Sequence, residues 1–288
     1  ETIVYDITNK RIKQTKRVFV YPRSNKTFKA DEFRSMVKQT VKRTSIGKRK
    51  IGVFLSGGLD SSMIAYELNK LKGPINTFTN RMDPAISLSH FQTTENFNDD
   101  ANWAYQLAKV EKFKHEEIRV TPQIMADYWD DSIYYMEQPV YNPSLAMYCY
   151  TNKVLHDNGI VVTMAGDMGD EILGGYPKYW KLRKKFELWG GKRIKWLHIL
   201  DNWLDRIKRP LKLHNLLIGR TELREELLKC YPDDIWNPDD PVGSYMALDC
   251  TAGVPEEFFM RNDKYGMAYG MEGRFPLASK TFMQYCMD

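Results

Sequence analysis

A short apolar run followed by a glycine-rich turn and a helical pattern, residues 51–73, constrains the fold of this chain most strongly. Residues 51–55 have the composition of a strand that is buried on both faces of a parallel sheet. Apolar residues then recur at helical spacing over residues 63–71, and Gly73 is a typical helix stop. The segment therefore predicts a strand, a tight turn and a helix in direct succession.

The turn between this strand and this helix reads Ser-Gly-Gly-Leu-Asp-Ser over residues 56–61. Backbone N–H groups and a helix N-terminus converge at such a turn, and this geometry binds an anion without any particular side chain. Ser56, Ser61 and Ser62 add hydroxyl donors. Asp60 has the wrong charge to contact a phosphate directly, so it favours a bridging cation, for which Mg²⁺ is usual. Because no G-x-x-x-x-G-K-[ST] sequence occurs, the turn is not a Walker loop.

A second segment rich in small and acidic residues, residues 165–177, follows another apolar run at residues 159–164. Ligands of parallel α/β sheets bind at the carboxyl ends of the strands, so both segments are candidates for one site. Asp60 and Asp170 could then share one Mg²⁺ with pyrophosphate oxygens and water. On its own this segment is also compatible with an ordinary solvated turn, and only its pairing with the first turn favours a cation–phosphate site.

The rest of the chain alternates between strand and helix patterns. Further strands are expected at residues 75–79 and 115–120, and helices at residues 31–41, 103–108, 122–133 and 145–155. Before these, residues 2–5 and 17–22 read as short strands and Asp31 as an N-cap. No strand is expected beyond residue 180. The alternation predicts an α/β fold, a doubly wound parallel sheet with a helical C-terminal part.

Composition excludes several classes of protein. The chain has 288 residues, 43% hydrophobic and 27% charged, which is ordinary for a globular protein with a large core. No apolar run approaches the ~20 residues that cross a bilayer, so no membrane association is expected. The four cysteines form no C-x-x-C pair, which favours neither a zinc site nor a disulfide framework and indicates the cytoplasm.

The net charge of +5 is concentrated in two basic tracts, residues 10–50 and 178–220. One interpretation is a footprint for nucleic acid or a membrane surface. The other is a solvated helical face, with the tryptophans of the second tract on its buried side. No RNA-binding signature with stacking aromatics is present, so the second interpretation is preferred and nucleic acid is not an expected partner.

Three motifs together resemble the synthetase domain of the glutamine-dependent asparagine synthetases, members of the ATP-pyrophosphatase (PP-loop) superfamily. Two are the segments 56–62 and 165–177. The third, residues 261–276, reads RNDKYGMAYGMEGRFP and is similar to the family stretch D-R-A-S-M-A-H-G-L-E-A-R-V-P. They follow the family's order within a domain expected over residues 31–288, with residues 178–245 as its basic helical segment. Residues 1–30 look like the junction left by the family's N-terminal glutaminase domain, which we expect in a longer protein; a homodimer is one possible assembly.

The resemblance implies that the side-chain carboxylate of aspartate attacks the α-phosphorus of ATP, that pyrophosphate departs, and that ammonia, free or from glutamine, displaces AMP to give asparagine. Asp60 and Asp170 match the metal-binding carboxylates, and Asp167 matches the acidic residue associated with forming the acyl-adenylate. Lys264 aligns with a basic residue that meets the phosphates, where its charge would stabilise the departing pyrophosphate; the alternative is an exposed helix charge. The positions that match nucleotide-binding ones are Leu55, Ser56, Gly57, Gly58, Asp60, Ser61, Ser62, Asn80, Ala165 and Gly166.

Departures from the family pattern concern the acceptor more than the reaction type. Where many members read D-E-P-x-x-D-P-S, this chain has Gln138 and Asn142 in place of two carboxylates. Asn80 replaces a usually apolar residue, and the V-P-F-L-D pattern loses its acid. For Glu272 and Arg274 a helix-end salt bridge is as good an interpretation as a substrate role. Three functions stay open: asparagine synthesis, a sibling amidotransferase for a carboxylate on a sugar or peptide, and a tRNA-acting or non-catalytic superfamily member.

Overall fold

The chain folds into two compact units, each described here by itself. The computed structural model describes residues 2–16, 27–86, 97–138, 142, 144–188 and 240–287. Unit 1 comprises residues 1–169 and 256–288, and unit 2 comprises residues 170–255.

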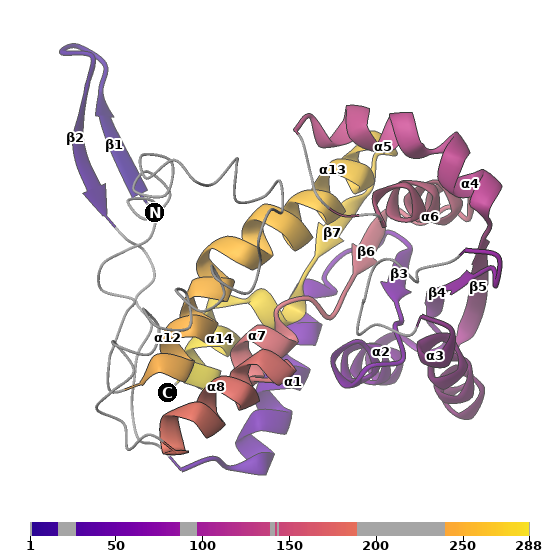
Figure 1. Ribbon diagram of the computed structural model, residues 1–288, viewed down its shortest axis with the longest axis horizontal. Coiled ribbons are helices and arrows are strands. Elements are labelled where there is room, and N and C mark those ends of the chain that lie inside the picture. Colours follow the sequence, from indigo (N-terminus) through magenta and orange to yellow (C-terminus); the bar gives the residue numbers. More distant parts are fainter. Residues whose placement is uncertain are drawn as a thin grey trace, which may run out of the picture. The chain divides into compact units, whose positions relative to one another are not determined.

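Unit 1 is built on a five-stranded parallel sheet with the strand order β5-β4-β3-β6-β7 (Figure 1). The strands are β3 (Ile51–Phe54), β4 (Asn76–Met82), β5 (Lys114–Val120), β6 (Val162–Met164) and β7 (Glu272–Arg274). The central strand β3 pairs with β4 on one side and with β6 on the other. All four parallel strands that the sequence predicts are confirmed, and β7 is an additional one.

Helices cover both faces of this sheet. The helices of unit 1 are α1 (Ala30–Thr44), α2 (Leu59–Lys72), α3 (Phe97–Glu111), α4 (Pro122–Asp127), α5 (Trp129–Met136), α6 (Leu145–Asp157), α13 (Met260–Ala268), the 3-10 helix η2 (Pro276–Ala278) and α14 (Lys280–Met287). Figure 1 shows α2 and α3 on one face of the sheet and α4, α5 and α6 on the other. This two-sided cover confirms the doubly wound α/β fold.

The direction of winding reverses between β3 and β6. From β3 the chain passes to β4 and then to β5 on one side, before it returns to β6 on the other side of β3. In such sheets ligands bind outside the carboxyl ends of the two strands at this switch point. The two small-residue segments, residues 56–61 and 165–169, follow these two strands, so the topology directs both to the same edge of the sheet.

Large apolar side chains fill the space between the sheet and α6. Phe78 of β4 and Ile118 of β5 pack with Leu155, Ile160 and Met271 in one cluster, and all five side chains are buried. Burial of one such side chain stabilises a fold by about 1.5–3 kcal/mol. The cluster therefore anchors the segments before β6 and β7 to the two strands on the opposite side of β3.

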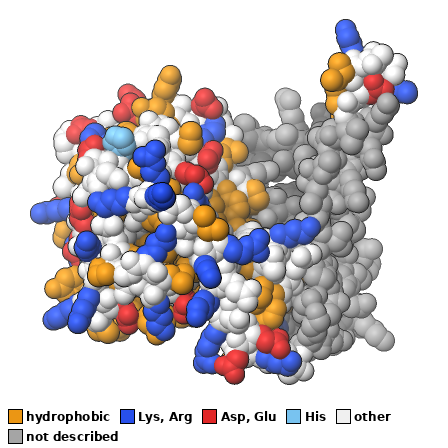
Figure 2. All heavy atoms as spheres, turned by 180° about the vertical axis from the view of Figure 1, so that it is seen from behind, with side chains coloured by type: hydrophobic (Ala, Val, Ile, Leu, Met, Phe, Trp, Pro, Cys, Tyr) orange, Lys and Arg blue, Asp and Glu red, His pale blue; other side chains and the backbone are white. Residues whose placement is uncertain are grey.

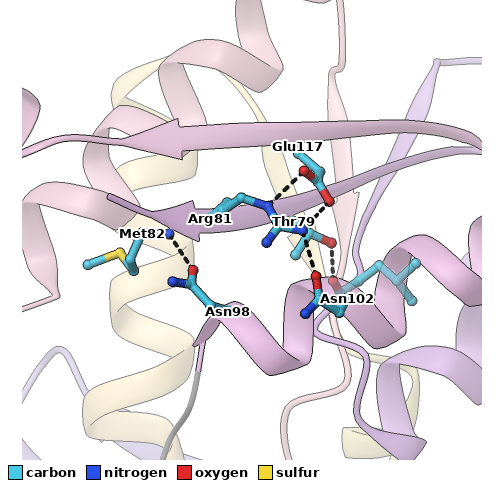
Figure 3. Close-up of polar contacts among 7 residues, drawn as sticks. Thr79, Arg81, Met82, Asn98, Asn102 and Glu117 are labelled. Carbon is cyan, nitrogen blue, oxygen red and sulfur yellow. Dashed lines mark hydrogen bonds and ion pairs between the residues drawn. The ribbon is translucent and has the colours of Figure 1, made fainter. Parts of the chain in front are cut away.

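A polar network on β4 joins this strand to its neighbours (Figure 3). The guanidinium of Arg81 donates to both carboxylate oxygens of Glu117 on β5, at 2.8 and 2.7 Å, and to Asn102 of α3 at 3.1 Å. The hydroxyl of Thr79 donates to the backbone oxygen of Leu55. These bonds fix the carboxyl-terminal half of β4 against β5, α3 and the end of β3.

Two predictions about helices are wrong in detail. The helix expected over residues 122–133 is divided into α4 and α5 at Tyr128, whose φ of −101° and ψ of 6° leave the helical region. Asp31 is not an N-cap, because α1 begins at Ala30 with Lys29 in the cap position, and Asp31 pairs with Arg34 at 2.8 Å instead. An acidic residue near the start of a helix can cap the helix or pair with a basic residue one turn later, and here Arg34 favours the pair.

The prediction that no strand follows residue 180 is also wrong. Strand β7 pairs in parallel with β6, although its three residues carry no β-branched or alternating pattern. Arg274 holds this strand in place, because its Nη1 donates to the backbone oxygens of Thr44 and Ile46 at 2.8 and 2.7 Å. Glu272 and Arg274 do form an ion pair, at 3.0 Å, but on a strand rather than at a helix end.

The amino-terminal residues form a hairpin of β1 (Thr2–Asp6) and β2 (Arg11–Lys16), which are antiparallel. In its turn the carboxylate of Asp6 accepts hydrogen bonds from the backbone N–H groups of Thr8 and Asn9. The short strand expected at residues 2–5 is therefore confirmed. The one expected at residues 17–22 lies outside the described residues.

The described part of unit 2 is helical. Its elements are α7 (Gly169–Leu173), which begins at the last residue of unit 1, α8 (Pro177–Leu188), α12 (Pro241–Leu248) and the π-helix η1 (Asp249–Phe259), which continues into unit 1. The carboxylate of Asp249 accepts a hydrogen bond from Tyr179 and pairs with Lys178, so it ties α8 to η1. Residues 189–239, which include most of the second basic tract, lie outside the described residues.

The surface gives few signs of a special environment. Figure 2 shows Lys and Arg side chains distributed among uncharged and apolar ones on the face that it draws. Among the described helices, none is both long and apolar enough to cross a membrane. Cys149, Cys250 and Cys286 are free thiols, of which the first two are buried and the third is partly buried.

Candidate functional site

The turn after β3 is held by its own serines. The hydroxyls of Ser56 and Ser61 lie 2.9 Å apart, and the backbone N–H of Ser56 donates to the Ser61 hydroxyl at 3.1 Å. The backbone of Gly58 belongs to the same network. Its N–H donates to the Ser56 hydroxyl at 3.3 Å, and its carbonyl oxygen accepts a hydrogen bond from the Ser61 hydroxyl at 3.2 Å. The turn is thus already folded where α2 begins, the arrangement in which backbone N–H groups bind an anion.

Gly57 occupies a position in this turn that other residues do not fit. Its φ is +82°, in the left-handed region, and a Cβ there would lie 2.2 Å from the backbone oxygen of Asp100 in α3. The first turn of α3 therefore packs closely on the loop and limits its conformations.

The segment after β6 packs directly on the turn after β3. A Cβ on Gly166 would lie 2.8 Å from the backbone nitrogen of Ser61, and one on Gly169 would lie 2.1 Å from Oδ2 of Asp60. Between these glycines the buried Met168 has a φ of +82°, a strained conformation for a residue with a side chain. Two motifs that are far apart in the sequence thus meet at the switch point of unit 1.

The two predicted metal-binding carboxylates belong to different units, Asp60 to unit 1 and Asp170 to unit 2. Asp60 lies against Gly169, and the chain continues from Gly169 into Asp170. Within unit 2, a Cβ on Gly175 would lie 1.9 Å from Oδ1 of Asp170, and burial raises the pKa of this carboxyl. Burial disfavours the charged form, which a nearby cation would favour.

Within the described part of the chain, no group of three or more His, Cys, Asp and Glu side chains is placed to hold a metal ion. Mg²⁺ usually takes one or two carboxylates and completes its shell with substrate phosphates and water. A Mg²⁺ ion shared by Asp60 and Asp170 stays a prediction.

The other predicted nucleotide-binding residues lie on, or directly after, three neighbouring strands. Leu55 directly follows β3, and its backbone N–H donates to the backbone oxygen of Phe78 at 2.9 Å. Asn80 lies on β4, where its side-chain oxygen accepts a hydrogen bond from the hydroxyl of Thr151 at 2.7 Å. Ala165 follows β6 and is buried. The sheet therefore places these residues on, or directly after, adjacent strands, and their contact with a nucleotide stays a prediction.

Asp167 lies between the glycines that contact the first turn. Its carboxylate is half-buried and accepts a hydrogen bond from the side chain of Asn262 at 3.2 Å. Burial raises the pKa of Asp167, while the positive charge of Arg261 and the bond from Asn262 oppose this rise. The third motif is thereby connected to the second.

Lys264 is half-buried and bonded, so it is not a free helix charge. Its ammonium group donates to the backbone oxygen of Met136 at 2.7 Å and to Oε2 of Glu137 at 2.9 Å. Glu137 ends α5 in the left-handed conformation, with a φ of 57°, and the hydrogen bond from Lys264 lowers the pKa of its carboxyl. Lys264 therefore joins α13 to the end of α5, and the contact with phosphates predicted for it is not tested by this geometry.

Two charged residues near the site were missed by the sequence analysis, Glu137 and Arg261. Glu137 has no signal beyond its place in a modified family segment. Arg261 has no such signal either, because an arginine is almost never fully buried unless it is paired. Its side chain is only 4% exposed.

A parallel α/β sheet with a glycine-rich turn at its switch point is typical of nucleotide-binding proteins. The sequence model of one such family, described as asparagine synthase, matches residues 32–288. The chain belongs to the asparagine synthase family, and the resemblance found in its three motifs is confirmed.

Individual relatives are distant. The chain is 27% identical to asparagine synthetase [glutamine-hydrolyzing] 3 of Bacillus subtilis over 283 residues, which cover 88% of this chain and 41% of that protein. It is 26% identical to asparagine synthetase [glutamine-hydrolyzing] 1 of Saccharomyces cerevisiae, with 88% and 39% covered. Among solved structures, an NMN synthetase from Francisella tularensis aligns with a TM-score of 0.36 at 15% identity, over 52% of this chain and 60% of that one. The chain thus spans less than half the length of the curated relatives that it matches.

Proposed function

We propose that this chain is the ATP-using part of an amide-forming ligase that makes asparagine from aspartate. Family membership supports the reaction type. The observation that carries the proposal is the packing of Gly169 against the carboxylate of Asp60, because it joins an anion-binding turn to a second acidic segment at the switch point of the sheet.

In the proposed reaction a side-chain carboxylate oxygen of aspartate attacks the α-phosphorus of ATP. The bond from this phosphorus to the oxygen that bridges to the β-phosphorus breaks, and pyrophosphate leaves with that oxygen. Ammonia then attacks the acyl carbon of the acyl-adenylate, and AMP leaves with the carboxylate oxygen that had attacked the phosphorus. The other carboxylate oxygen becomes the amide oxygen, and loss of protons from nitrogen completes the amide.

Each of the predicted site residues has its own role in this proposed reaction. The backbone N–H groups and hydroxyls of residues 56–62 bind the pyrophosphate part of ATP. Asp60 and Asp170 would hold Mg²⁺, which when bound neutralises charge on the phosphates. Asp167 is the acidic residue that takes part in forming the acyl-adenylate in this proposal. Lys264 supplies a positive charge near the departing pyrophosphate, if it exchanges its bond to Glu137 for one to a phosphate oxygen.

One contact supports a second candidate, a sibling amidotransferase that acts on a different carboxylate. The amide nitrogen of Asn142 donates to Oε1 of Glu257 at 2.9 Å. An aspartate at position 142, as in many family members, would place two negative charges together there. The amide is thus matched to its neighbour, which supports a changed acceptor pocket rather than a chance substitution.

Ammonia is proposed to come from glutamine through a partner glutaminase domain, or free from solution. A cytoplasmic location and a homodimer are proposed as well. No contact of the described residues favours the tRNA-acting alternative.

The test is pyrophosphate release from ATP and Mg²⁺ with ammonium, measured with and without aspartate and with a panel of other carboxylic acids. Aspartate-dependent release together with AMP and asparagine supports the first candidate. Release that depends on a different acid supports the second. Absence of release with every acid, in a protein shown to be folded and to bind ATP, would refute both.

A further inference from the structure

Arg261 is the most unusual charged residue in the described part of unit 1. Its side chain is only 4% exposed, and its guanidinium lies 3.9 Å from the ring centre of Tyr148 and 5.1 Å from that of Phe258. The two aromatic rings hold the planar group in a fixed orientation.

The hydrogen-bonding capacity of this guanidinium is not used within the described part of the chain. Its buried Nε has no hydrogen-bond partner, and its single ion-pair partner, Glu257, lies 3.9 Å away. A guanidinium carries five N–H donors, and burying such donors without acceptors is costly. The packing of Arg261 therefore lacks the polar partners that a purely structural buried arginine requires.

Two other partly buried arginines of the same unit show what a structural role looks like. Arg81 donates to both oxygens of Glu117 and to Asn102. Arg274 donates to two backbone oxygens and to Glu272. Arg261 is less exposed than either of them and has none of these bonds.

The position of Arg261 connects it with the proposed reaction. The next residue, Asn262, donates to Asp167, and the charge of Arg261 acts on the same carboxyl. Glu257, its loose partner, also accepts the bond from Asn142, in the segment where this chain departs from the family pattern. Arg261 is thus linked to the proposed adenylation residue through its neighbour Asn262, and to the segment expected to contact the acceptor through Glu257.

We propose that Arg261 binds a second carboxylate of the acceptor, the one that does not react, and so selects dicarboxylic substrates. This inference rests on the proposed function for its site. A carboxylate matches the fork of a guanidinium, which can donate two parallel N–H bonds to it. A doubly charged phosphate fits less well, because Glu257 already places negative charge beside the arginine and the turn at residues 56–61 provides a separate anion site.

The test compares acceptors that differ only in the second carboxylate. Aspartate and β-alanine are such a pair, because β-alanine keeps the amino group and the reacting carboxylate. Equilibrium binding to the whole chain is measured by calorimetry for aspartate, β-alanine, succinate and inorganic phosphate, and KM and kcat are measured wherever pyrophosphate is released. Arg261→Met is expected to weaken aspartate and succinate about 10- to 100-fold, the range of a charge-assisted contact, with no change for β-alanine. Arg261→Lys keeps the charge without the planar fork, so an intermediate loss is expected.

Two further variants keep the test decisive. Glu257→Gln removes the competing charge from a side chain that is 47% exposed, so it should fold and bind dicarboxylates about two- to five-fold more tightly. Arg119→Met is the matched control, because it removes an arginine that is 72% exposed and pairs with Asp83 on the surface. It should leave all four affinities unchanged.

The outcomes separate this inference from the proposed function. Equal loss of aspartate and β-alanine in Arg261→Met, a loss confined to phosphate or to the KM for ATP, or no change in Glu257→Gln would overturn the role of Arg261. Dicarboxylate binding that depends on Arg261 in a protein that releases no pyrophosphate would support this inference and refute the proposed function.

Discussion

The conformation of Gly57 gives a prediction about how tightly the first turn is packed. In Gly57→Ala the new Cβ would lie 2.2 Å from the backbone oxygen of Asp100, and the alanine must keep a φ of +82°. The left-handed conformation costs about 1–2 kcal/mol, and overpacking against backbone costs about 1–3 kcal/mol. The free energy of unfolding should therefore fall by about 2–5 kcal/mol.

The neighbouring Gly58 provides a matched control. Its φ is −70°, and an added Cβ would meet only the Ser56 hydroxyl, at 3.3 Å. Gly58→Ala loses a modest N-cap preference of about 1 kcal/mol or less. The two variants differ by a single methyl group each, placed one residue apart in the same turn.

Urea unfolding followed by tryptophan fluorescence and circular dichroism measures the difference. With an m-value of about 3 kcal/mol/M, the Gly57 variant should lower the midpoint by roughly 0.7–1.7 M and the Gly58 variant by roughly 0.3 M or less. Equal midpoints for the two variants would refute the argument, because the close approach of α3 would then not determine the conformation of the turn.

Three further predictions concern the charges at the site. Gly169→Ala should push aside the carboxylate of Asp60 and reduce Mg²⁺-dependent pyrophosphate release at least ten-fold. The urea midpoint should change little, because the new methyl group displaces a side chain rather than backbone. Lys264→Ala should slow pyrophosphate release by about 10²–10³, measured as kcat, if its charge acts in the transition state. In the same variant the pKa of Glu137, lowered in the native chain by the hydrogen bond from Lys264, should rise toward its ordinary value in a side-chain NMR titration.

The sign of the pH effect follows from the direction of that pKa shift. The folded-state pKa of Glu137 lies below its unfolded value, so the pair with Lys264 stabilises the fold fully above the unfolded pKa, and this stabilisation is lost as the pH falls through the folded pKa. A native chain whose Glu137 titrates normally would contradict the contact. An unchanged kcat in Lys264→Ala would leave that lysine a purely structural link between α13 and α5.

Local patterns predicted most of the sheet and both glycine-rich segments. Strands β3 and β6 lie in apolar runs, whereas β4 and β5 carry their apolar and β-branched residues among polar ones, and a helix follows each of the four. The switch point follows from the order in which such units wind, so the meeting of residues 56–61 with residues 165–169 was within reach of sequence reasoning.

Features that depend on distant contacts were not predictable in the same way. Strand β7 is three residues long. The guanidinium of Arg274 holds it by donating to the backbone oxygens of Thr44, at the end of α1, and of Ile46. The division between α4 and α5 at Tyr128 leaves no mark in the apolar spacing. The bond of Lys264 to the end of α5 likewise joins residues that only the folded chain brings together. In each case tertiary structure decides, whereas local propensity is weak or ambiguous.

The glycines at the switch point show why fold and function impose the same restrictions here. Gly57, Gly166 and Gly169 are each required by an atom of another segment, and two of those atoms belong to Asp60 and Ser61 of the turn proposed to bind pyrophosphate. A larger residue at Gly57 or Gly166 would meet backbone atoms and separate the segments whether or not a nucleotide is bound, whereas one at Gly169 would displace the carboxylate of Asp60. Arg261 differs, because its neighbours only hold it in place and provide no hydrogen-bond acceptor among the described residues. Substitution of the glycines therefore tests the geometry of the site, whereas substitution of Arg261 tests which molecule the site accepts.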